Sequence, residues 1–277
     1  MLRQIKKVVG GVPVLGGALK RVYRSLLCYG NGRFSIGLLN RSLNIFGYKA
    51  VPKGLGYLSA REVLKKARQN NLSVCEYLEG NNVGGVGKRR DLIIGALRQY
   101  LPPKLSSVLE IGAGTGMYLE RIVELYSPTT YEVYETSLEW VGYLNQTYSG
   151  RTRLKCHNAD GSSLRGTISA SVDAVFCHGV FVYLPLITTF GYLEEMARVA
   201  KPDGWIIFDC FLTKNFGVNI VKQWQSDPHH WTFAVVISED LINEFLAKYS
   251  LSCVGRFDTP YHASFSTYFV VRKMPTQ

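Results

Sequence analysis

The segment 108–116 constrains the fold of this chain most strongly, because an apolar run leads there into an acid and three alternating glycines, Val-Leu-Glu-Ile-Gly-Ala-Gly-Thr-Gly. We expect a buried strand over 107–111 and a helix over 118–125. Glycines let a ligand approach the backbone closely, and the first N–H groups of a helix have no intrahelical partner. The segment therefore predicts a strand, a turn and a helix that can hold a ligand, with a tight turn that binds nothing as the alternative.

The chain beyond this segment repeats the alternation of short apolar runs and helical stretches. We expect further strands over 131–134, 153–157, 174–177, 205–211, 252–257 and 267–272. We expect further helices over 138–148, 187–199 and 239–249, and helical stretches before the first strand over 59–69 and 88–100. Strands separated by helices predict an α/β fold with a parallel sheet covered on both faces and ligands at the carboxyl ends of its strands.

The Glu-x-Gly-x-Gly-x-Gly spacing that begins at Glu110 differs from the Gly-x-Gly-x-x-Gly spacing of dinucleotide sites. It resembles the first cofactor motif of the class I S-adenosylmethionine-dependent methyltransferases, and the resemblance extends over about residues 88–273. It implies a Rossmann-like, seven-stranded, mostly parallel sheet, a helical N-terminal extension, and a small-molecule methyltransferase with S-adenosyl-L-methionine as cofactor. The cofactor contacts that it implies in this motif are Glu110, Gly112, Ala113, Gly114 and Gly116.

Later motifs follow in the order that the resemblance requires. The cofactor contacts that they imply come after successive strands: Glu135 and Thr136, Asp160 and Gly161, and Cys177 and His178. A carboxylate at Glu135 can accept both ribose hydroxyls, as acids do in dinucleotide folds; a surface carboxylate is the alternative. The resemblance assigns Asp160 to the adenine amino group, with an ordinary Asp-Gly turn as the alternative.

Departures from the family pattern narrow the expected chemistry. Many members carry His where this chain has Tyr183, so a His-dependent mechanism is not transferred to that position. The chain lacks the acid pair with a neighbouring Asn that marks a metal-dependent catechol site. It also lacks the Asn/Asp-Pro-Pro-Tyr signature of amino-methylating enzymes after the fourth expected strand. We therefore expect a metal-free transfer to oxygen or carbon.

Three histidines are the candidate catalytic residues, because a hydroxyl is a poor nucleophile at neutral pH and a general base adds roughly 10²–10⁴ in rate. His178 is the first candidate, with a polar lining residue as the alternative, and His229 and His230 are the others. The last two lie in an acceptor-side insertion at about 212–237. Aromatic faces with polar tips suit a sugar or an aromatic ring. We expect Tyr183, Trp224 and Trp231 to contact the acceptor, with packing of a cap on the sheet edge as the alternative for Trp224.

The positive charge of the chain lies entirely in its N-terminal fifth. Residues 1–61 hold 11 of the 32 Lys and Arg residues and none of the acids, which leaves 21 basic and 21 acidic residues over 62–277. We divide the chain into a basic, partly helical extension over 1–80 and a catalytic domain over 81–277. Apolar residues recur at helical steps within 1–27, which favours binding to an anionic membrane surface. Mitochondrial targeting, nucleic-acid binding and packing on the domain are the alternatives.

Composition excludes several classes of protein. No window holds 18 consecutive apolar residues, and the six cysteines form no Cys-x-x-Cys pair, so the sequence argues against a spanning helix, a zinc cluster and a disulfide framework. We expect a cytoplasmic protein, with peripheral association at the inner face of a membrane or a mitochondrial location as alternatives. The leading hypothesis is O-methylation of a small-molecule, glycan or lipid-linked hydroxyl. A cofactor-binding adaptor at a membrane surface and an RNA methyltransferase are the competing hypotheses, and the neutral body argues against nucleic acid.

Overall fold

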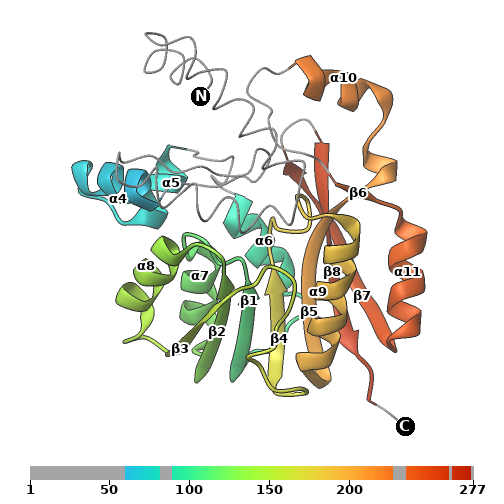
Figure 1. Cartoon of the computed structure of the whole chain (residues 1–277), viewed down its shortest axis with the longest axis horizontal. Helices are drawn as coiled ribbons and strands as arrows, with labels where there is room; N and C mark the ends of the chain where they lie inside the picture. The colour runs from blue at the N-terminus through green and yellow to red at the C-terminus, as the bar shows by residue number, and fades with distance from the viewer. Residues whose placement is uncertain (1–59, 82–88, 227–234, 262–263, 276–277) are drawn as a thin grey trace, which may run out of the picture. The chain divides into compact units, whose positions relative to one another are not determined.

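The computed structural model describes residues 60–81, 89–226, 235–261 and 264–275 (Figure 1). In these residues, seven strands lie side by side in the order β3-β2-β1-β4-β5-β8-β7, and a short strand, β6, pairs with the end of β5. Their bounds are β1 Ser107–Ile111, β2 Thr130–Glu135, β3 Arg153–Asn158, β4 Val172–Cys177, β5 Ala200–Leu212, β6 Val236–Ile237, β7 Leu251–Tyr261 and β8 Ser264–Lys273. Within this sheet β8 runs opposite to the other strands, so its pairs with β5 and β7 are antiparallel and the remaining pairs are parallel.

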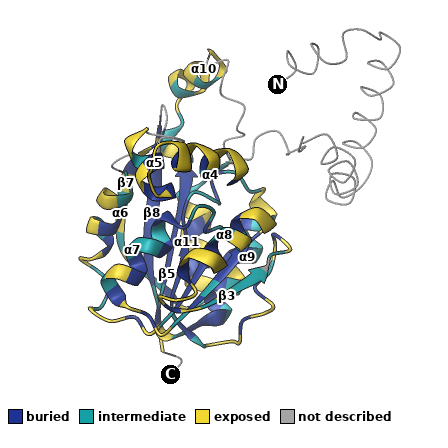
Figure 2. Cartoon of the chain, turned by 90° about the vertical axis from the view of Figure 1, so that its left-hand side faces the viewer, coloured by how far each residue is buried: buried dark blue, intermediate teal, exposed yellow. Residues whose placement is uncertain are grey.

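Helices cover both faces of the sheet. Their bounds are α4 Ala60–Gln69, α5 Val74–Gly80, α6 Arg89–Leu97, α7 Met117–Tyr126, α8 Leu138–Tyr148, α9 Leu186–Val199, α10 Val218–Ser226 and α11 Glu239–Lys248. One core joins the sheet to α6, α7 and α8, and the other joins it to α9 and α11. Figure 2 shows the buried strands enclosed by helices whose outer faces are exposed. The expected α/β fold with a mostly parallel sheet is confirmed.

The chain changes direction across the sheet between β1 and β4. From β1 it moves outward to β2 and β3, and it then returns to β4, which pairs with the other edge of β1. The register places Ile111 beside both Tyr134 and Cys177, so three strands end at one level. In open α/β sheets, ligands bind at the carboxyl ends of the strands beside such a switch point.

Helices α4 and α5 pack on the α/β body, although the sequence analysis placed their residues in the N-terminal extension. Apolar side chains of both helices, including Val63 and Leu78, share a buried cluster with Met117 of α7 and Trp140 of α8. A capping box at Ser73 fixes the start of α5. The part of the extension that the structure describes is therefore helical and continuous with this core.

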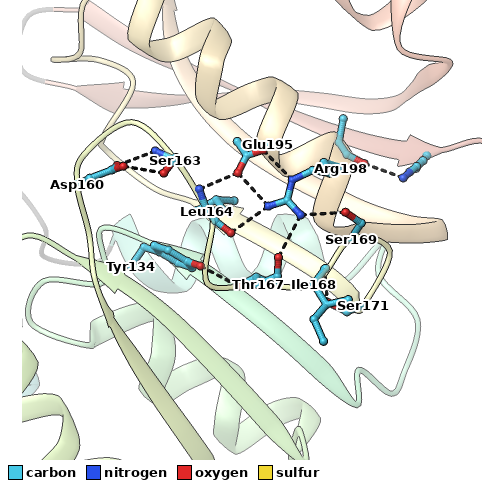
Figure 3. A network of polar contacts seen from close by, with 12 residues as sticks. Tyr134, Asp160, Ser163, Leu164, Thr167, Ile168, Ser169, Ser171, Glu195 and Arg198 are labelled. Carbon is cyan, nitrogen blue, oxygen red and sulfur yellow. Dashed lines mark hydrogen bonds and ion pairs between the residues drawn. The ribbon is translucent and has the colours of Figure 1, made fainter.

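A polar network fixes the long connection between β3 and β4 (Figure 3). The guanidinium of Arg198 on α9 pairs with Glu195 at 2.7 Å and donates hydrogen bonds to the carbonyls of Leu164 and Thr167. Glu195 in turn accepts the N–H of Leu164 at 2.8 Å. Charge-assisted bonds of this kind are about twice as strong as neutral ones, so the segment after β3 is held on α9.

Several predictions concern residues outside the described part of the chain. These are the basic segment 1–27, most of the N-terminal extension, and the candidates His229, His230 and Trp231. In the described ranges, no helix has the length and apolar character that crossing a membrane requires.

Candidate active site

The three glycines after β1 all have positive φ, as the sequence spacing requires. Their φ values are 72° at Gly112, 51° at Gly114 and 79° at Gly116, a region that other residues rarely adopt. The turn is anchored because Gly112 donates its N–H to the carbonyl of Tyr134 at 2.8 Å, and Gly116 donates to Ala113 at 2.8 Å. The motif therefore forms a rigid turn that leads directly into α7.

The glycines differ in what surrounds them. A Cβ at Gly112 would lie 2.6 Å from Val180 Cγ2, and a Cβ at Gly116 would lie 2.8 Å from Leu144 Cδ2, so both are required for packing. A Cβ at Gly114 would meet nothing closer than the carbonyl oxygen of Gly112, at 3.9 Å. The space above Gly114 is therefore open, as a backbone cradle for a ligand must be.

Glu135, at the end of β2, connects this turn to the start of α8. Its carboxylate is only 7% exposed, and it accepts the N–H of Gly114 at 2.9 Å and the N–H of Ser137 at 2.7 Å. The exposed Thr136 lies beside it, with its hydroxyl 3.4 Å from the carboxylate. A carboxylate held at the end of the second strand, beside a glycine turn, fits the ribose hydroxyls of an adenosyl group.

Glu110 is the second carboxylate beside the glycine turn, and it is almost completely buried. Tyr131 donates its hydroxyl to Glu110 at 2.7 Å. Burial raises the pKa of Glu110 to about 7, and the nearby charge of Glu135 contributes to this increase although the bond from Tyr131 opposes it. A cationic ligand in the cradle would favour the ionised form of Glu110.

Asp160 closes a local turn after β3. Its carboxylate accepts the backbone N–H groups of Ser162 and Ser163, at 2.7 and 2.8 Å, and both of their hydroxyls. Burial raises the pKa of Asp160, but these bonds outweigh that effect and hold the pKa at about 2. Gly161 supplies the positive φ of 77°. The turn that the sequence left as the alternative is therefore present, and contact with adenine stays a prediction.

The two residues at the end of β4 have different surroundings. The thiol of Cys177 is fully buried in the core that contains α9 and α11. His178 is 8% exposed and stacks on the ring of Tyr118, with the two centroids 4.0 Å apart. Among the described residues, neither ring nitrogen of His178 has a hydrogen-bond partner. Burial, with a contribution from the charge of Arg89, lowers the pKa of His178 to about 3, so the imidazole is neutral at physiological pH.

Two of the three expected acceptor contacts lie in one aromatic cluster. Tyr183 and Trp224 pack around the buried residues Phe211 and Tyr261. The ring of Tyr183 lies 6.3 Å from that of Tyr261, and the ring of Trp224 lies 5.8 Å from that of Phe211. Both rings pack within this cluster, and contact of either residue with an acceptor stays a prediction.

The structure also brings together polar residues that the sequence analysis did not combine. Arg89, at the start of α6, lies over the ring of Tyr261 at 4.2 Å and 3.9 Å from the carboxylate of Asp209 on β5. Tyr268 of β8 lies beside His178, with ring centroids 5.7 Å apart. The sequence did contain one indication of this group. Asp209 is an acid within the apolar run 205–212, and a charge in a buried strand needs a partner.

No group of His, Cys, Asp or Glu side chains in the described ranges has the arrangement of a metal site. The described part of the site therefore consists of a glycine cradle, two buried carboxylates and a neutral histidine. These residues fit S-adenosylmethionine, because the open backbone at Gly114 can approach the ligand and Glu135 can accept hydroxyls.

Comparison with known proteins gives one family match and several similar solved structures. Residues 109–208 match a family model described as "Methyltransferase domain". Burkholderia thailandensis 1,6-didemethyltoxoflavin-N1-methyltransferase, solved with S-adenosylhomocysteine, is similar at 18% identity and a TM-score of 0.52, over 82% of this chain and 93% of that one. Synechocystis magnesium protoporphyrin IX methyltransferase, also solved with S-adenosylhomocysteine, is similar at 15% identity and a TM-score of 0.51, over 85% and 93%.

A third similar structure is a chain from the complex between the Haloferax volcanii Trm112 methyltransferase activator and a methyltransferase, at 18% identity and a TM-score of 0.53, over 73% of this chain and 98% of that one. No curated protein sequence matches significantly. Residues 109–208 therefore match a methyltransferase domain, and the similar structures share the fold of this chain.

The contrast between Gly114 and Gly116 gives a first prediction. Gly114→Arg places a side chain in open space, so we expect it to abolish binding of S-adenosylhomocysteine and to cost only about 1–2 kcal/mol in backbone strain. Gly116→Ala forces a methyl group against Leu144 and Tyr148, so we expect it to lower the free energy of unfolding by about 2 kcal/mol or more. Calorimetry and chemical denaturation measure the two effects.

Gly142→Ala on α8 is the matched control, because nothing lies within 4 Å of the added methyl group. It should leave cofactor binding unchanged and leave stability equal or slightly higher. Unimpaired binding by Gly114→Arg would show that the ligand does not approach this turn.

The buried carboxyl of Glu110 gives a second prediction. The folded protein keeps a proton on Glu110 up to pH about 7, whereas the unfolded chain loses it near the ordinary value of 4.5. Raising the pH through this window therefore destabilises the folded state, by up to ~3 kcal/mol at pH 8. Glu110→Gln lacks this effect, so the variant should gain stability relative to the wild type between pH 5 and 8. Denaturant unfolding at both pH values measures the difference, and a difference that does not change with pH would contradict the shifted pKa.

Proposed function

We propose that this enzyme transfers the methyl group to an oxygen of a small-molecule, glycan or lipid-linked acceptor. The carrying observation is that Tyr118, two residues after the glycine turn, stacks on His178, and that Arg89 lies over Tyr261 of the aromatic cluster. These contacts support an acceptor position beside the glycine turn. The names of two similar enzymes, which act on a toxoflavin precursor and on magnesium protoporphyrin IX, support a small-molecule acceptor.

The residues of the cradle hold and orient the reactants. The turn at Gly112–Gly116 and the carboxylate of Glu135 would hold the cofactor, with Thr136, Asp160 and Gly161 toward its adenosine half. When bound, S-adenosylmethionine supplies a methyl group on a positively charged sulfur, which keeps the electron pair of the broken bond as a thioether. The protein must place the acceptor oxygen in line with that bond, and positioning of this kind contributes ~7–11 kcal/mol in favourable cases.

His178 contacts the acceptor oxygen in this proposal, but as a neutral hydrogen-bonding group. A base with a pKa of about 3 holds a proton poorly at neutral pH, so the general-base role that the sequence suggested does not fit its burial. The acceptor oxygen therefore has to be acidic enough to ionise by itself, or it has to lose its proton to solvent. His229 and His230 stay candidate bases outside the described residues.

We also propose that the basic segment 1–27 binds an anionic membrane surface and brings the enzyme to a lipid-linked or membrane-embedded acceptor. The amphipathic sequence of the segment and the positive charge of residues 1–61 support this proposal. Location in the cytoplasm at the inner face of a membrane follows as part of this proposal.

A product screen tests the proposed reaction. The purified protein is incubated with labelled S-adenosylmethionine and pooled hydroxylated aromatics, glycans and lipid extracts, and methylated products are identified by mass spectrometry and NMR. We expect label on oxygen, with turnover lost in Gly114→Arg and kept in Gly142→Ala. Label found on nitrogen or carbon would contradict O-methylation while leaving the methyltransferase class intact.

Deletion of residues 1–27 tests the proposed membrane binding. We expect the truncated chain to lose association with vesicles that contain anionic phospholipid, and to bind S-adenosylhomocysteine as the full chain does. Vesicle flotation at low and high salt measures the association, because screening weakens binding by surface charge. Equal flotation of the two chains would contradict the proposal.

A further inference from the structure

The guanidinium of Arg89 is a buried cation with unused hydrogen-bonding capacity. Its side chain is 15% exposed, and its nearest carboxylate, Asp209, lies at 3.9 Å, beyond hydrogen-bond distance. Asp209 already accepts the N–H of Gly179 at 2.6 Å and the hydroxyl of Ser266. The ion pair between Arg89 and Asp209 is therefore a long one without a hydrogen bond. The Nε of Arg89 also lacks a hydrogen-bond partner in the described part of the chain.

Two further buried polar groups lie beside it. His178 is 8% exposed, and within the described ranges its ring nitrogens make no hydrogen bond. Tyr268 is fully buried, and the polar group beside its hydroxyl is the hydroxyl of Tyr118. A buried polar group without a partner costs about 1–3 kcal/mol, so native proteins rarely keep several together without a ligand or water to satisfy them. The unpartnered ring of His178 beside a loosely paired cation, with Tyr268 next to both, indicates a built site for a polar ligand.

The position of this group places the ligand on the acceptor side. Asp209, Tyr261 and Tyr268 belong to β5, β7 and β8, whereas the cradle residues follow β1, β2 and β3. Arg89 also lies over Tyr261, which belongs to the aromatic cluster with Tyr183. A ligand that reaches Arg89 from the cradle therefore meets aromatic surface.

We propose that Arg89, His178 and Tyr268 bind an ionised oxygen carried by an aromatic ring, so that the acceptor is an aromatic carboxylate or an acidic phenol. The guanidinium has five donors in a planar fork that matches a carboxylate. The hydroxyl of Tyr268 and one nitrogen of His178 can donate to the same oxyanion. This proposal rests on the O-methylation proposed above and specifies its substrate class.

The neutral state of His178 supports an acceptor that arrives ionised. Burial and the charge of Arg89 lower the pKa of His178 to about 3, so its neutral imidazole is a weak base at neutral pH. A buried cation, by contrast, lowers the pKa of a bound acid and keeps its oxygen ionised.

The test uses benzoate and its neutral isostere benzamide as probes, on the full chain saturated with S-adenosylhomocysteine. Ligand-observed NMR titration gives both dissociation constants. We expect the wild type to bind benzoate at least tenfold more tightly than benzamide, and Arg89→Gln to remove this difference while binding S-adenosylhomocysteine normally. Arg89→Lys should keep part of the preference, because the charge remains without the fork. Arg98→Gln, at an exposed arginine just after α6, is the matched control and should behave as the wild type.

Two results would overturn the proposal. Equal binding of benzoate and benzamide by the wild type would show that the group does not select an anion. This comparison uses the wild-type protein alone, so it does not depend on the folding of a variant. Loss of S-adenosylhomocysteine binding in Arg89→Gln with the benzoate preference kept would assign the guanidinium to the cofactor instead. The product screen identifies the methylated atom independently of the benzoate titration. A failure of O-methylation can therefore be distinguished from a failure of anion binding.

Discussion

The hydrogen bond from the N–H of Gly114 to the carboxylate of Glu135 is the interaction on which the site depends. A carboxylate that is only 7% exposed needs donors, and Glu135 obtains them from two different segments, the turn after β1 and the start of α8. The bond therefore fixes the end of β2 against the glycine turn. It also leaves this carboxylate beside the open backbone of Gly114, where the hydroxyls of a nucleoside can reach it.

The two halves of the site carry side chains of opposite charge. Glu135 and Glu110 lie on the side of β1 and β2, where the negative charge of Glu135 would stabilise a positively charged sulfonium and the sulfonium would favour ionisation of Glu110. Arg89 lies on the side of β5, β7 and β8, where an anionic acceptor is stabilised. Opposite charges on the two reactants also attract each other in a low-dielectric site. This arrangement favours binding of a cationic methyl donor and an ionised oxygen in adjacent positions.

The sequence predicted the sheet and the cradle because these depend on local patterns. The apolar runs and the glycine spacing placed β1, β2 and α7 within one or two residues. The anion-binding group could not be found in this way, since Arg89, His178 and Tyr268 are distant in sequence and meet only through the strand order. The surroundings of two further residues also matter: burial lowers the pKa of His178, and hydrogen bonds from Ser162 and Ser163 hold the carboxylate of Asp160. Neither effect is visible in the type of residue alone.

The most direct measurement is a crystal structure of the protein with S-adenosylhomocysteine. The ribose hydroxyls should lie within hydrogen-bond distance of the Glu135 carboxylate, and the thioether should lie beside the turn at Gly112–Gly114. Ligand density elsewhere on the sheet, or a ribose that makes no contact with Glu135, would contradict the assignment of the cradle.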